Sequence, residues 1–229
     1  MRKALLNWLN ANPIFAKRVH QFKFWWRNNS VIHNGINNTI HHHNAALEAN
    51  IIEIHGNNNV LVFEAGSSVK HCTIKIFGSG RRLYVGKEVV LTESLIWFED
   101  ENCEIRFGAG TTMQRYGHIA VTEPGRKIQI GKNCMFSFNV DIRNGDSHAI
   151  FNAGTGKRIN YAKDIIIHDR VWLGAYTQIL GGADIGNDSI VGIRSLVSKA
   201  VPEGVIVAGI PAKVVREQVK WSAARKDEM

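Results

Sequence analysis

A large aliphatic residue recurs every six positions toward the carboxyl end of the chain, usually with a small residue after it. The repeated pairs are Leu173-Gly174, Ile179-Leu180, Ile185-Gly186, Val191-Gly192 and Val197-Ser198. Such a six-residue unit describes one face of a parallel β-helix, in which a short strand is followed by a turn and three faces complete a coil. The aliphatic side chains then stack inward from coil to coil. The pattern predicts an all-β solenoid.

The repeat continues upstream with a longer period. Its marker residues, which are 22, 22 and 23 positions apart, are Phe63, Val85, Phe107 and Ile130. This spacing corresponds to a coil of about 18 residues with a few extra turn residues. The asparagines at 57–59 mark turns, because asparagine tolerates left-handed backbone conformations. We therefore expect the β-helix to occupy residues 30–205.

The period breaks once, between Ile142 and Ile165, where the chain reads RNGDSHAIFNAGTGKRINYAKD. This stretch is rich in Gly, Asn and Asp and predicts an inserted loop over residues 143–163. Insertions in a solenoid leave on one side and commonly carry function. The loop is therefore the first place to look for chemistry.

The two ends differ from the repeat. Residues 1–29 mix aromatic and aliphatic residues with basic ones and predict one or two amphipathic helices broken near Pro13. We expect them to cap the first coil, or alternatively to rest on an anionic membrane surface as a peripheral contact. Residues 206–229 form a closing segment in which Pro211 is expected to open a helix.

Charge and cysteine content bear on the binding partners and the cellular compartment of the protein. The formal net charge is +8 over 229 residues, which alone does not indicate nucleic-acid binding. No stretch approaches the roughly 18 apolar residues of a membrane span. The three cysteines form no CxxC pair, and no signal-like apolar segment begins the chain. We expect free thiols and a cytoplasmic location.

The carboxyl half resembles the hexapeptide-repeat acyltransferases. The resemblance is carried by residues 165–216 (IIIHDRVWLGAYTQILGGADIGNDSIVGIRSLVSKAVPEGVIVAGIPAKVVRE, including the closing phrase AGIPAKVVR) and by the upstream phrase IGKNCMFSFNVDIRNGDSH. It is similar to the sugar and cell-surface polysaccharide O-acetyltransferases. The resemblance implies a left-handed parallel β-helix, acetyl transfer from acetyl-CoA to a hydroxyl, and a homotrimer with sites between neighbouring subunits.

Within that family we expect a saccharide acceptor belonging to capsule, O-antigen or exopolysaccharide. The alternative acceptors are a free sugar such as a galactoside or maltose, an amino group on a nucleotide sugar, and a drug. A nonenzymatic solenoid scaffold is the alternative of another class. Zinc enzymes on the same solenoid use a close HxxxxH pair that is missing around His148, so no metal site is expected.

Histidine is the natural base for activating a hydroxyl at neutral pH. His148 lies in the inserted loop, two residues after Asp146 and 24 before Trp172. The resemblance implies that His148 is the catalytic base and that Trp172 is the aromatic residue of the site, although Trp172 also fits a packing role. Asp146 fits an orienting contact to the imidazole, a sugar hydroxyl contact, or a simple Asx turn. Asn139 and Arg143 are expected to contact the acceptor.

Other histidines have simpler explanations. His41, His42 and His43 are adjacent, and neighbouring positions on a strand point to opposite faces. A surface or interface role is therefore expected for the triplet rather than metal binding.

The resemblance also implies residues for acetyl-CoA. They are Gly174 and Ala175 at the thioester end, Ile193, Ser198 and Lys199 along the pantetheine and nucleotide, and Lys213 and Arg216 near the phosphates. A solvated basic rim is the alternative for the three cations. The chain departs from the family at Ile193, where a small residue is common, and at Arg194, where glycine is usual.

Overall fold

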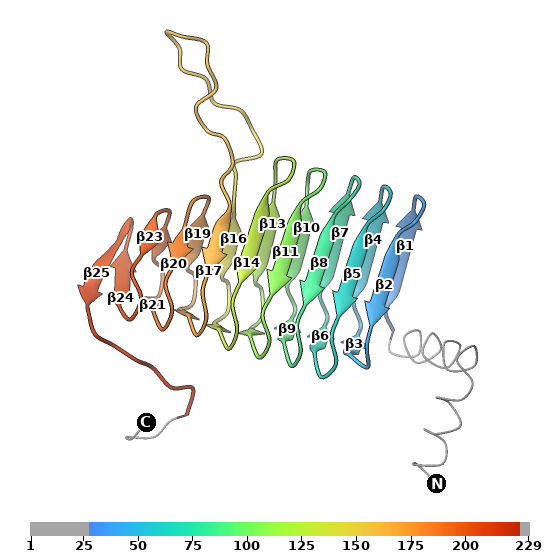
Figure 1. Ribbon diagram of the computed structural model, residues 1–229, viewed down its shortest axis with the longest axis horizontal. Coiled ribbons are helices and arrows are strands. Elements are labelled where there is room, and N and C mark those ends of the chain that lie inside the picture. The colour runs from blue at the N-terminus through green and yellow to red at the C-terminus, as the bar shows by residue number, and fades with distance from the viewer. Residues whose placement is uncertain (1–27, 225–229) are drawn as a thin grey trace.

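The structure is a computed structural model that describes residues 28–224. It forms a solenoid of three parallel sheets, in which each strand pairs with the strand one coil further on (Figure 1). The prediction of an all-β solenoid is confirmed, and the coils are of the left-handed type. We call the sheets A, B and C in chain order and name each corner by the two sheets that it joins.

The strands are as follows. Sheet A contains β1 (Ser30–Asn34), β4 (Ile51–His55), β7 (Thr73–Phe77), β10 (Leu95–Phe98), β13 (His118–Val121), β16 (Asp141–Arg143), β19 (Gln178–Leu180) and β22 (Leu196–Val197). Sheet B contains β2 (Thr39–His42), β5 (Val60–Phe63), β8 (Arg82–Val85), β11 (Glu104–Phe107), β14 (Lys127–Ile130), β17 (Ile165–Ile167), β20 (Asp184–Ile185) and β23 (Ala200–Val201). Sheet C contains β3 (Ala46–Glu48), β6 (Ser68–Lys70), β9 (Val90–Thr92), β12 (Thr112–Met113), β15 (Met135–Phe136), β18 (Trp172–Leu173), β21 (Ile190–Val191), β24 (Ile206–Gly209) and β25 (Ala212–Arg216).

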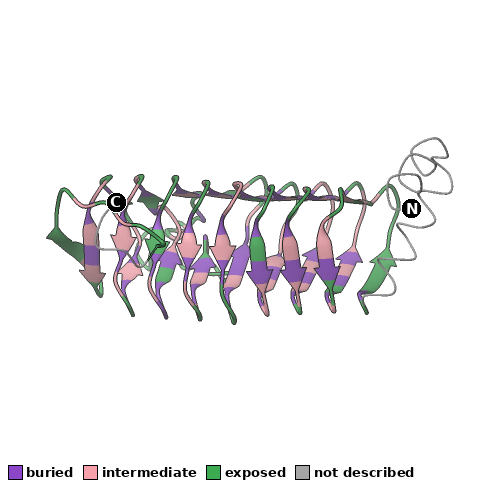
Figure 2. Cartoon of the chain, turned by 90° about the horizontal axis from the view of Figure 1, so that it is seen from below, coloured by how far each residue is buried: buried purple, intermediate pink, exposed green. Residues whose placement is uncertain are grey.

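Stacked aliphatic side chains form the core. In sheet A, Ile74, Ile96, Ile119, Ile142 and Ile179 occupy equivalent positions on successive strands, and each is fully buried. The alternate residues of each strand face outward, as the period of two requires. Figure 2 shows the buried segments recurring along the solenoid. The repeated aliphatic residues of the sequence are therefore the inward-facing residues that stack along each sheet.

Polar side chains line two of the corners in the early coils. At corner AB the side-chain oxygen of Asn38 accepts hydrogen bonds from the backbone and side-chain amides of Asn59, both at 2.9 Å. Asn59 in turn accepts from the backbone N–H of Arg81 at 2.9 Å. Asn29 and Asn50 form the equivalent ladder at corner CA. These ladders satisfy backbone donors that would otherwise be buried without a partner.

The closing segment corrects one prediction. Residues 212–216 form β25, an antiparallel strand paired with β24, and not the helix expected after Pro211. The open edge of β24 offers unpaired backbone groups that a returning strand satisfies, and the β-branched pair Val214 and Val215 favours extended backbone over helix. β24 itself pairs with β21 in the parallel sheet, so the solenoid continues past residue 205 to Gly209.

The predicted amino-terminal helices fall mostly in residues 1–27, outside the described residues. The first described strand, β1, is exposed along its whole length. Within residues 28–224 the structure contains no helix that is long and apolar enough to cross a membrane.

Candidate active site

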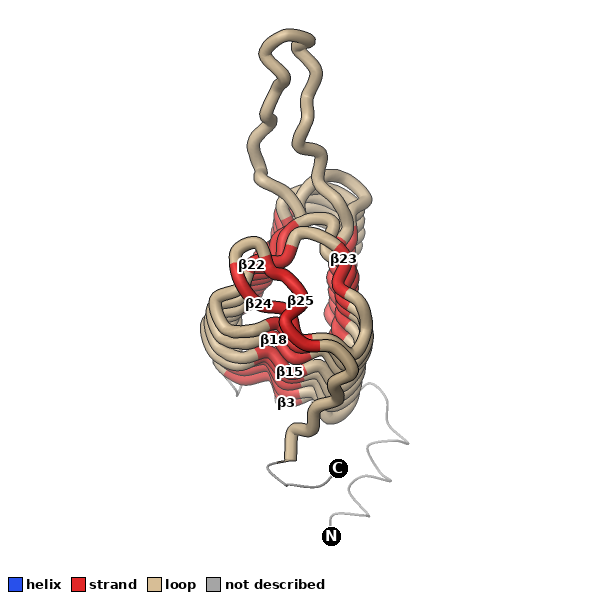
Figure 3. The backbone as a smooth tube through the Cα atoms, turned by 90° about the vertical axis from the view of Figure 1, so that its left-hand side faces the viewer, coloured by secondary structure: helices blue, strands red, loops and turns tan. Residues whose placement is uncertain are grey.

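The inserted segment leaves the solenoid at corner AB. β16 ends at Arg143 and β17 begins at Ile165, and the residues between them project from the coils as a long excursion (Figures 1 and 3). Its two arms are joined by an antiparallel bridge between Phe151 and Arg158. The side chain of Arg158 also reaches back to Glu123 on the solenoid. The excursion is therefore tied both to itself and to the coils.

Asn160 fixes the base of the excursion beside His148. Its side-chain amide donates to Asp146 Oδ2 at 2.9 Å and to the carbonyl of His148 at 2.7 Å. Its side-chain oxygen accepts from the N–H of Ile150 at 2.7 Å. Asp146 is therefore bonded to Asn160, and among the described residues no hydrogen bond joins it to the imidazole. The imidazole of His148 is exposed, and its orientation by Asp146 stays a prediction.

Trp172 begins β18 on the outer face of sheet C and is 37% exposed. Its ring packs against that of Trp221, which follows β25. Figure 3 shows β18 and the excursion on different sides of the solenoid. A single chain therefore does not bring His148 and Trp172 together.

A row of small residues runs from the position after Trp172 toward the carboxyl end. Gly174 lies beside Gly192, Gly192 lies beside Ala208, and Ala208 pairs with Lys213 on β25. The N–H of Gly174 donates to the carbonyl of Val191 at 2.8 Å. In the described structure the N–H of Ala175 has no acceptor. Of the two residues predicted at the thioester end, Ala175 is therefore the one whose N–H is free.

The basic pair Lys213 and Arg216 lies at the end of the same sheet. Trp172, Ile190, Ile206 and Arg216 occupy one register line across four strands. With about 4.8 Å between strands, Arg216 lies about 14 Å from Trp172 along the sheet. The two cations are exposed, so their side chains are open to a ligand.

The remaining predicted cofactor residues are divided between corners. Ile193 is 65% exposed at corner CA, and the guanidinium of Arg194 lies 5.0 Å from the ring centroid of Tyr176. Ser198 and Lys199 follow β22 and lie at corner AB, the corner from which the excursion leaves. The structure therefore does not group Ser198 and Lys199 with Ala175.

Arg143, predicted to contact the acceptor, is paired within the chain. Its Nε donates to Asp141 Oδ1 at 3.1 Å and its Nη2 to Asp141 Oδ2 at 2.6 Å. His118 Nδ1 lies 3.1 Å from the same Oδ1. Burial raises the pKa of Asp141, but hydrogen bonds from His118 and Arg143 and the charge of Arg143 outweigh burial and hold the pKa below its usual value.

Sequence reasoning missed the contacts of Asp141. The Asp-x-Arg spacing was the available signal, since residues two apart on a strand share a face. His118 occupies the same register position one strand earlier. Asn139, the other predicted acceptor contact, lies at corner CA with a left-handed φ of 55°.

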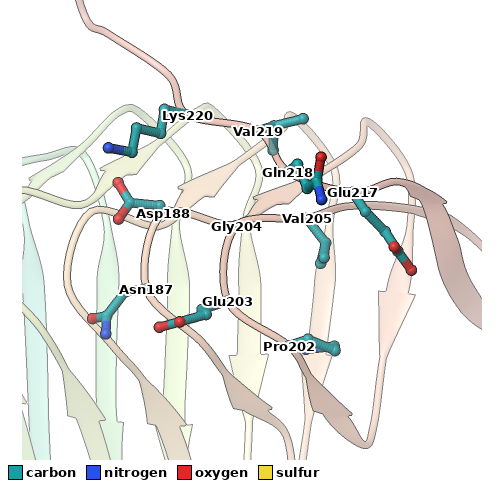
Figure 4. Close-up of a pocket in the computed structure, with 10 residues that line it drawn as sticks. All are labelled: Asn187, Asp188, Pro202, Glu203, Gly204, Val205, Glu217, Gln218, Val219 and Lys220. Carbon is teal, nitrogen blue, oxygen red and sulfur yellow. The ribbon is translucent and has the colours of Figure 1, made fainter.

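A cavity of about 450 Å³ lies under the segment that follows β25 (Figure 4). Asp188, Glu203 and Glu217 line it together with Lys220. These carboxylates disfavour the phosphates of CoA, and none of the predicted site residues lines the cavity. We do not assign it to the donor.

Among residues 28–224, neither the cysteines nor the histidines at 41–43 form a second catalytic or metal site. Burial raises the pKa of Cys72 and Cys134 to about 11, so both remain neutral thiols. The rings of His41 and His43 are parallel, with centroids 6.0 Å apart. No group of three His, Cys, Asp or Glu side chains in this part of the chain is arranged to hold a metal ion.

Known proteins are similar to this chain in both sequence and fold. No family model matches the chain. The polysialic acid O-acetyltransferase of Neisseria meningitidis is 36% identical over 189 residues, covering 82% of this chain and 86% of that protein. The chain belongs to the hexapeptide-repeat O-acetyltransferases that include this enzyme. It is therefore an acyltransferase, as predicted, and the scaffold alternative is wrong.

Two crystal structures of the same family superpose on the solenoid. The polysialic acid O-acetyltransferase OatWY matches with a TM-score of 0.83 and 32% identity, covering 88% of this chain and 94% of that chain. The polySia-specific acetyltransferase NeuO matches with a TM-score of 0.75 and 30% identity, covering 88% and 92%. The likeness extends well beyond the carboxyl half on which the resemblance was recognised.

In this O-acetyltransferase the candidate site residues form two groups. The loop group, at corner AB, consists of Asp146, His148, Ser198 and Lys199. The sheet group, on sheet C and corner CA, consists of Trp172, Gly174, Ala175, Ile193, Lys213 and Arg216. The predicted base, His148, and the free N–H of Ala175 lie in different groups, so neither group alone contains all the predicted elements of the site.

Proposed function

We propose that the enzyme transfers the acetyl group of acetyl-CoA to a sugar hydroxyl of an acidic capsular polysaccharide, at sites formed between neighbouring subunits of a homotrimer. Polysialic acid, the acceptor named for the relatives, is the first acceptor to test. The formal net charge of +8 supports an acidic polymer. O-antigen, exopolysaccharide and free sugars are the acceptors to test next.

The separation of the loop group from the sheet group within one chain is the main support for a site shared between subunits. His148 belongs to corner AB and Trp172 to sheet C of the same chain. In a trimer with threefold rotational symmetry, each interface joins one surface of a subunit to a different surface of the next subunit. In the proposed trimer the loop group of one subunit therefore faces the sheet group of the next, and each boundary holds one complete site.

The chemistry assigns a role to each group. His148 removes the proton of the acceptor hydroxyl, whose oxygen then attacks the thioester carbonyl carbon. The N–H of Ala175 donates to the oxyanion of the tetrahedral intermediate. As the carbon–sulfur bond breaks, His148 returns the proton to the departing sulfur. The products are the O-acetyl sugar and free CoA.

Acetyl-CoA fits the row of small residues on sheet C. Gly174, Gly192 and Ala208 present no bulky side chain outward, which leaves room for the pantetheine arm. Lys213 and Arg216 at the far end offer charge-assisted hydrogen bonds to phosphate. Trp172 and Ala175 then lie at the thioester end.

Subunit complementation tests the shared site. His148→Ala and Trp172→Ala chains with different tags are co-expressed, and mixed trimers are isolated through both tags. Every mixed trimer contains one boundary with an intact His148 facing an intact Trp172, so transfer from labelled acetyl-CoA to polysialic acid should return to about one third of wild type. Mixed trimers of His148→Ala chains with chains that carry both His148→Ala and Trp172→Ala should stay inactive, because no subunit then supplies His148. No recovery in the first mixture would place the whole site within one chain.

We further propose that the reaction occurs in the cytoplasm. Cys72, Cys103 and Cys134 are all buried free thiols, which is usual in a reducing compartment. Fractionation of the native cells tests this placement, and recovery of the protein with exported proteins would contradict it.

A further inference from the structure

One row of residues at corner CA differs in chemistry from the rest of that corner. Tyr116, Asn139, Tyr176 and Arg194 follow one another on successive coils, each with a left-handed φ between 55° and 63°. The N–H of each donates to a carbonyl of the preceding coil, which fixes the alignment. We call these four residues the corner row. Ala175, with its free N–H, immediately precedes Tyr176.

The aromatic members of this region point outward. Tyr116 is 60% exposed, Tyr176 is 43% exposed, and Phe138, the neighbour of Asn139, is 42% exposed. Phe138 packs edge-on against Tyr176 with centroids 5.2 Å apart. The two tyrosines and Phe138 therefore present ring surface to solvent over three consecutive coils.

The backbone makes this choice of residues costly. Left-handed backbone costs an ordinary side chain about 1 kcal/mol or more, and glycine or asparagine avoids most of that cost. Earlier coils carry Ala49, His71 and Glu93 at the equivalent position. At this corner position aromatic residues occur only on the coil of Ala175 and on the coil two before it. The Tyr176 ring packs against Phe138 and Arg194, whereas the Tyr116 ring has no aromatic or cation contact among the described residues.

We propose that the corner row binds the acceptor polysaccharide, with Tyr176 next to the reacting sugar and Tyr116 under a sugar further along the polymer. This inference rests on the proposed function. Aromatic rings bind the C–H faces of sugars, whereas Asn139 and Arg194 supply hydrogen bonds to hydroxyl and carboxylate groups.

The path assigned to acetyl-CoA gives the direction of the polymer, and the spacing of the coils gives its step. The row of small residues assigned to acetyl-CoA leads from Ala175 toward the carboxyl end, so the acceptor enters from the opposite side, where Asn139 and Tyr116 lie. Successive coils are about 4.8 Å apart, a step close to the length of one sugar unit. A chain of sugars can therefore follow the row and keep one ring at each coil.

Polymer length gives the sharpest test. Tyr116→Ala should raise the KM for long polysialic acid by about five- to tenfold and leave the KM for a sialic acid dimer unchanged, because the dimer is too short to reach Tyr116. Tyr176→Ala should raise both. Tyr116→Phe, which keeps the ring, should behave as wild type. His71→Ala, at the same corner two coils beyond Tyr116, is the matched control and should change neither KM.

Binding without turnover separates this inference from the proposed function. Fluorescent long polysialic acid should bind His148→Ala protein, and Tyr116→Ala in that background should weaken binding about five- to tenfold. Weakened binding would support the corner row even if the wild type acetylated no polymer, which would contradict only the proposed function. Undiminished binding by the double variant, or no binding at all, would overturn the row as a saccharide site.

The competing occupant of this surface is a neighbouring subunit. Light scattering of Tyr116→Ala and Tyr176→Ala decides between the two. An unchanged oligomeric state with length-dependent KM values supports the saccharide site. Dissociation of the oligomer in either variant would show that the row is a subunit interface.

Discussion

The indole of Trp221 lies against the indole of Trp172, with ring centroids 6.0 Å apart and planes tilted by 49°. The Nε1–H of Trp221 donates to the carbonyl of Arg170 at 2.6 Å, and the N–H of Val219 donates to the carbonyl of Gly204 at 2.8 Å. The chain after β25 thus returns across corner BC and places Trp221 beside the aromatic residue of the candidate site.

Truncation at Trp221 tests the importance of this contact. Removal of residues 222–229 leaves both tryptophans and should keep acetyl transfer near the wild-type rate. Removal of residues 221–229 deletes the ring contact and should lower kcat/KM by roughly three- to tenfold, as expected for an aromatic pair. Steady-state kinetics on both chains make the comparison. Equal rates would show that Trp221 does not support Trp172.

Asp141 should make the stability of the protein depend on acid pH. Its pKa in the folded protein is below the ordinary value of about 3.9, so the carboxylate stabilises the fold above that value, and this contribution is lost as pH falls through the lower native pKa. Asp141→Asn should cost about 1 kcal/mol at pH 7 and less at pH 2. Calorimetric unfolding at both values checks this.

The control for Asp141 is Glu53→Gln, on the outer face of the same sheet. It should leave the difference between the two pH values as in wild type. A loss of stability in Asp141→Asn that is equal at pH 7 and pH 2 would show that shape rather than charge matters at this position.

Arg81 should be replaceable with a gain in stability. It is 1% exposed, and its Nε and Nη1 are buried without a hydrogen-bond partner among the described residues. The two positions before it in the corner column are Asn38 and Asn59, whose side chains form the corner AB ladder. Arg81→Asn should extend that ladder and raise the free energy of unfolding by about 1 to 2 kcal/mol, because an unsatisfied buried group is removed.

Chemical denaturation of Arg81→Asn and Arg81→Met checks this prediction. Methionine fills the space without donors and should also stabilise, but by less than asparagine. A fall in stability in both variants would mean that the guanidinium is satisfied by ordered water.

The sequence predicts the solenoid because the buried aliphatic column is local and periodic. The strand at Ala212–Arg216 was mistaken for a helix because Pro211 is a good helix start, and only the tertiary neighbour β24 reveals an edge to be paired. Trp221 and its acceptor Arg170 are 51 residues apart, so no local pattern connects them. The division of the site residues between corners likewise depends on where each turn falls in the coil.

The basic end of sheet C should control the use of acetyl-CoA. Lys213→Ala or Arg216→Ala should raise the KM for acetyl-CoA about five- to thirtyfold, the equivalent of losing about 1 to 2 kcal/mol of charge-assisted phosphate binding. The effect should shrink with the thioester of dephospho-CoA if the 3′-phosphate is the partner. Lys220→Ala, further along the chain, is the control. Unchanged KM values in both variants would remove Lys213 and Arg216 from the site.

His148 is the predicted catalytic base, so its replacement tests the proposed chemistry most directly. It is exposed at the base of the excursion and is held through its carbonyl by Asn160. In the proposed trimer it faces the sheet group of the neighbouring subunit. His148→Ala should lower kcat by about 10² to 10⁴-fold with acetyl-CoA binding nearly intact, because general-base catalysis contributes on that order. The wild-type rate should fall at acid pH, since a protonated imidazole cannot accept the hydroxyl proton. The combined replacement of His41, His42 and His43 by alanine should have far less effect, because these residues lie in the early coils. Full activity of folded His148→Ala protein would sink the mechanism, and an inactive but folded triple variant would move the site to the amino-terminal coils.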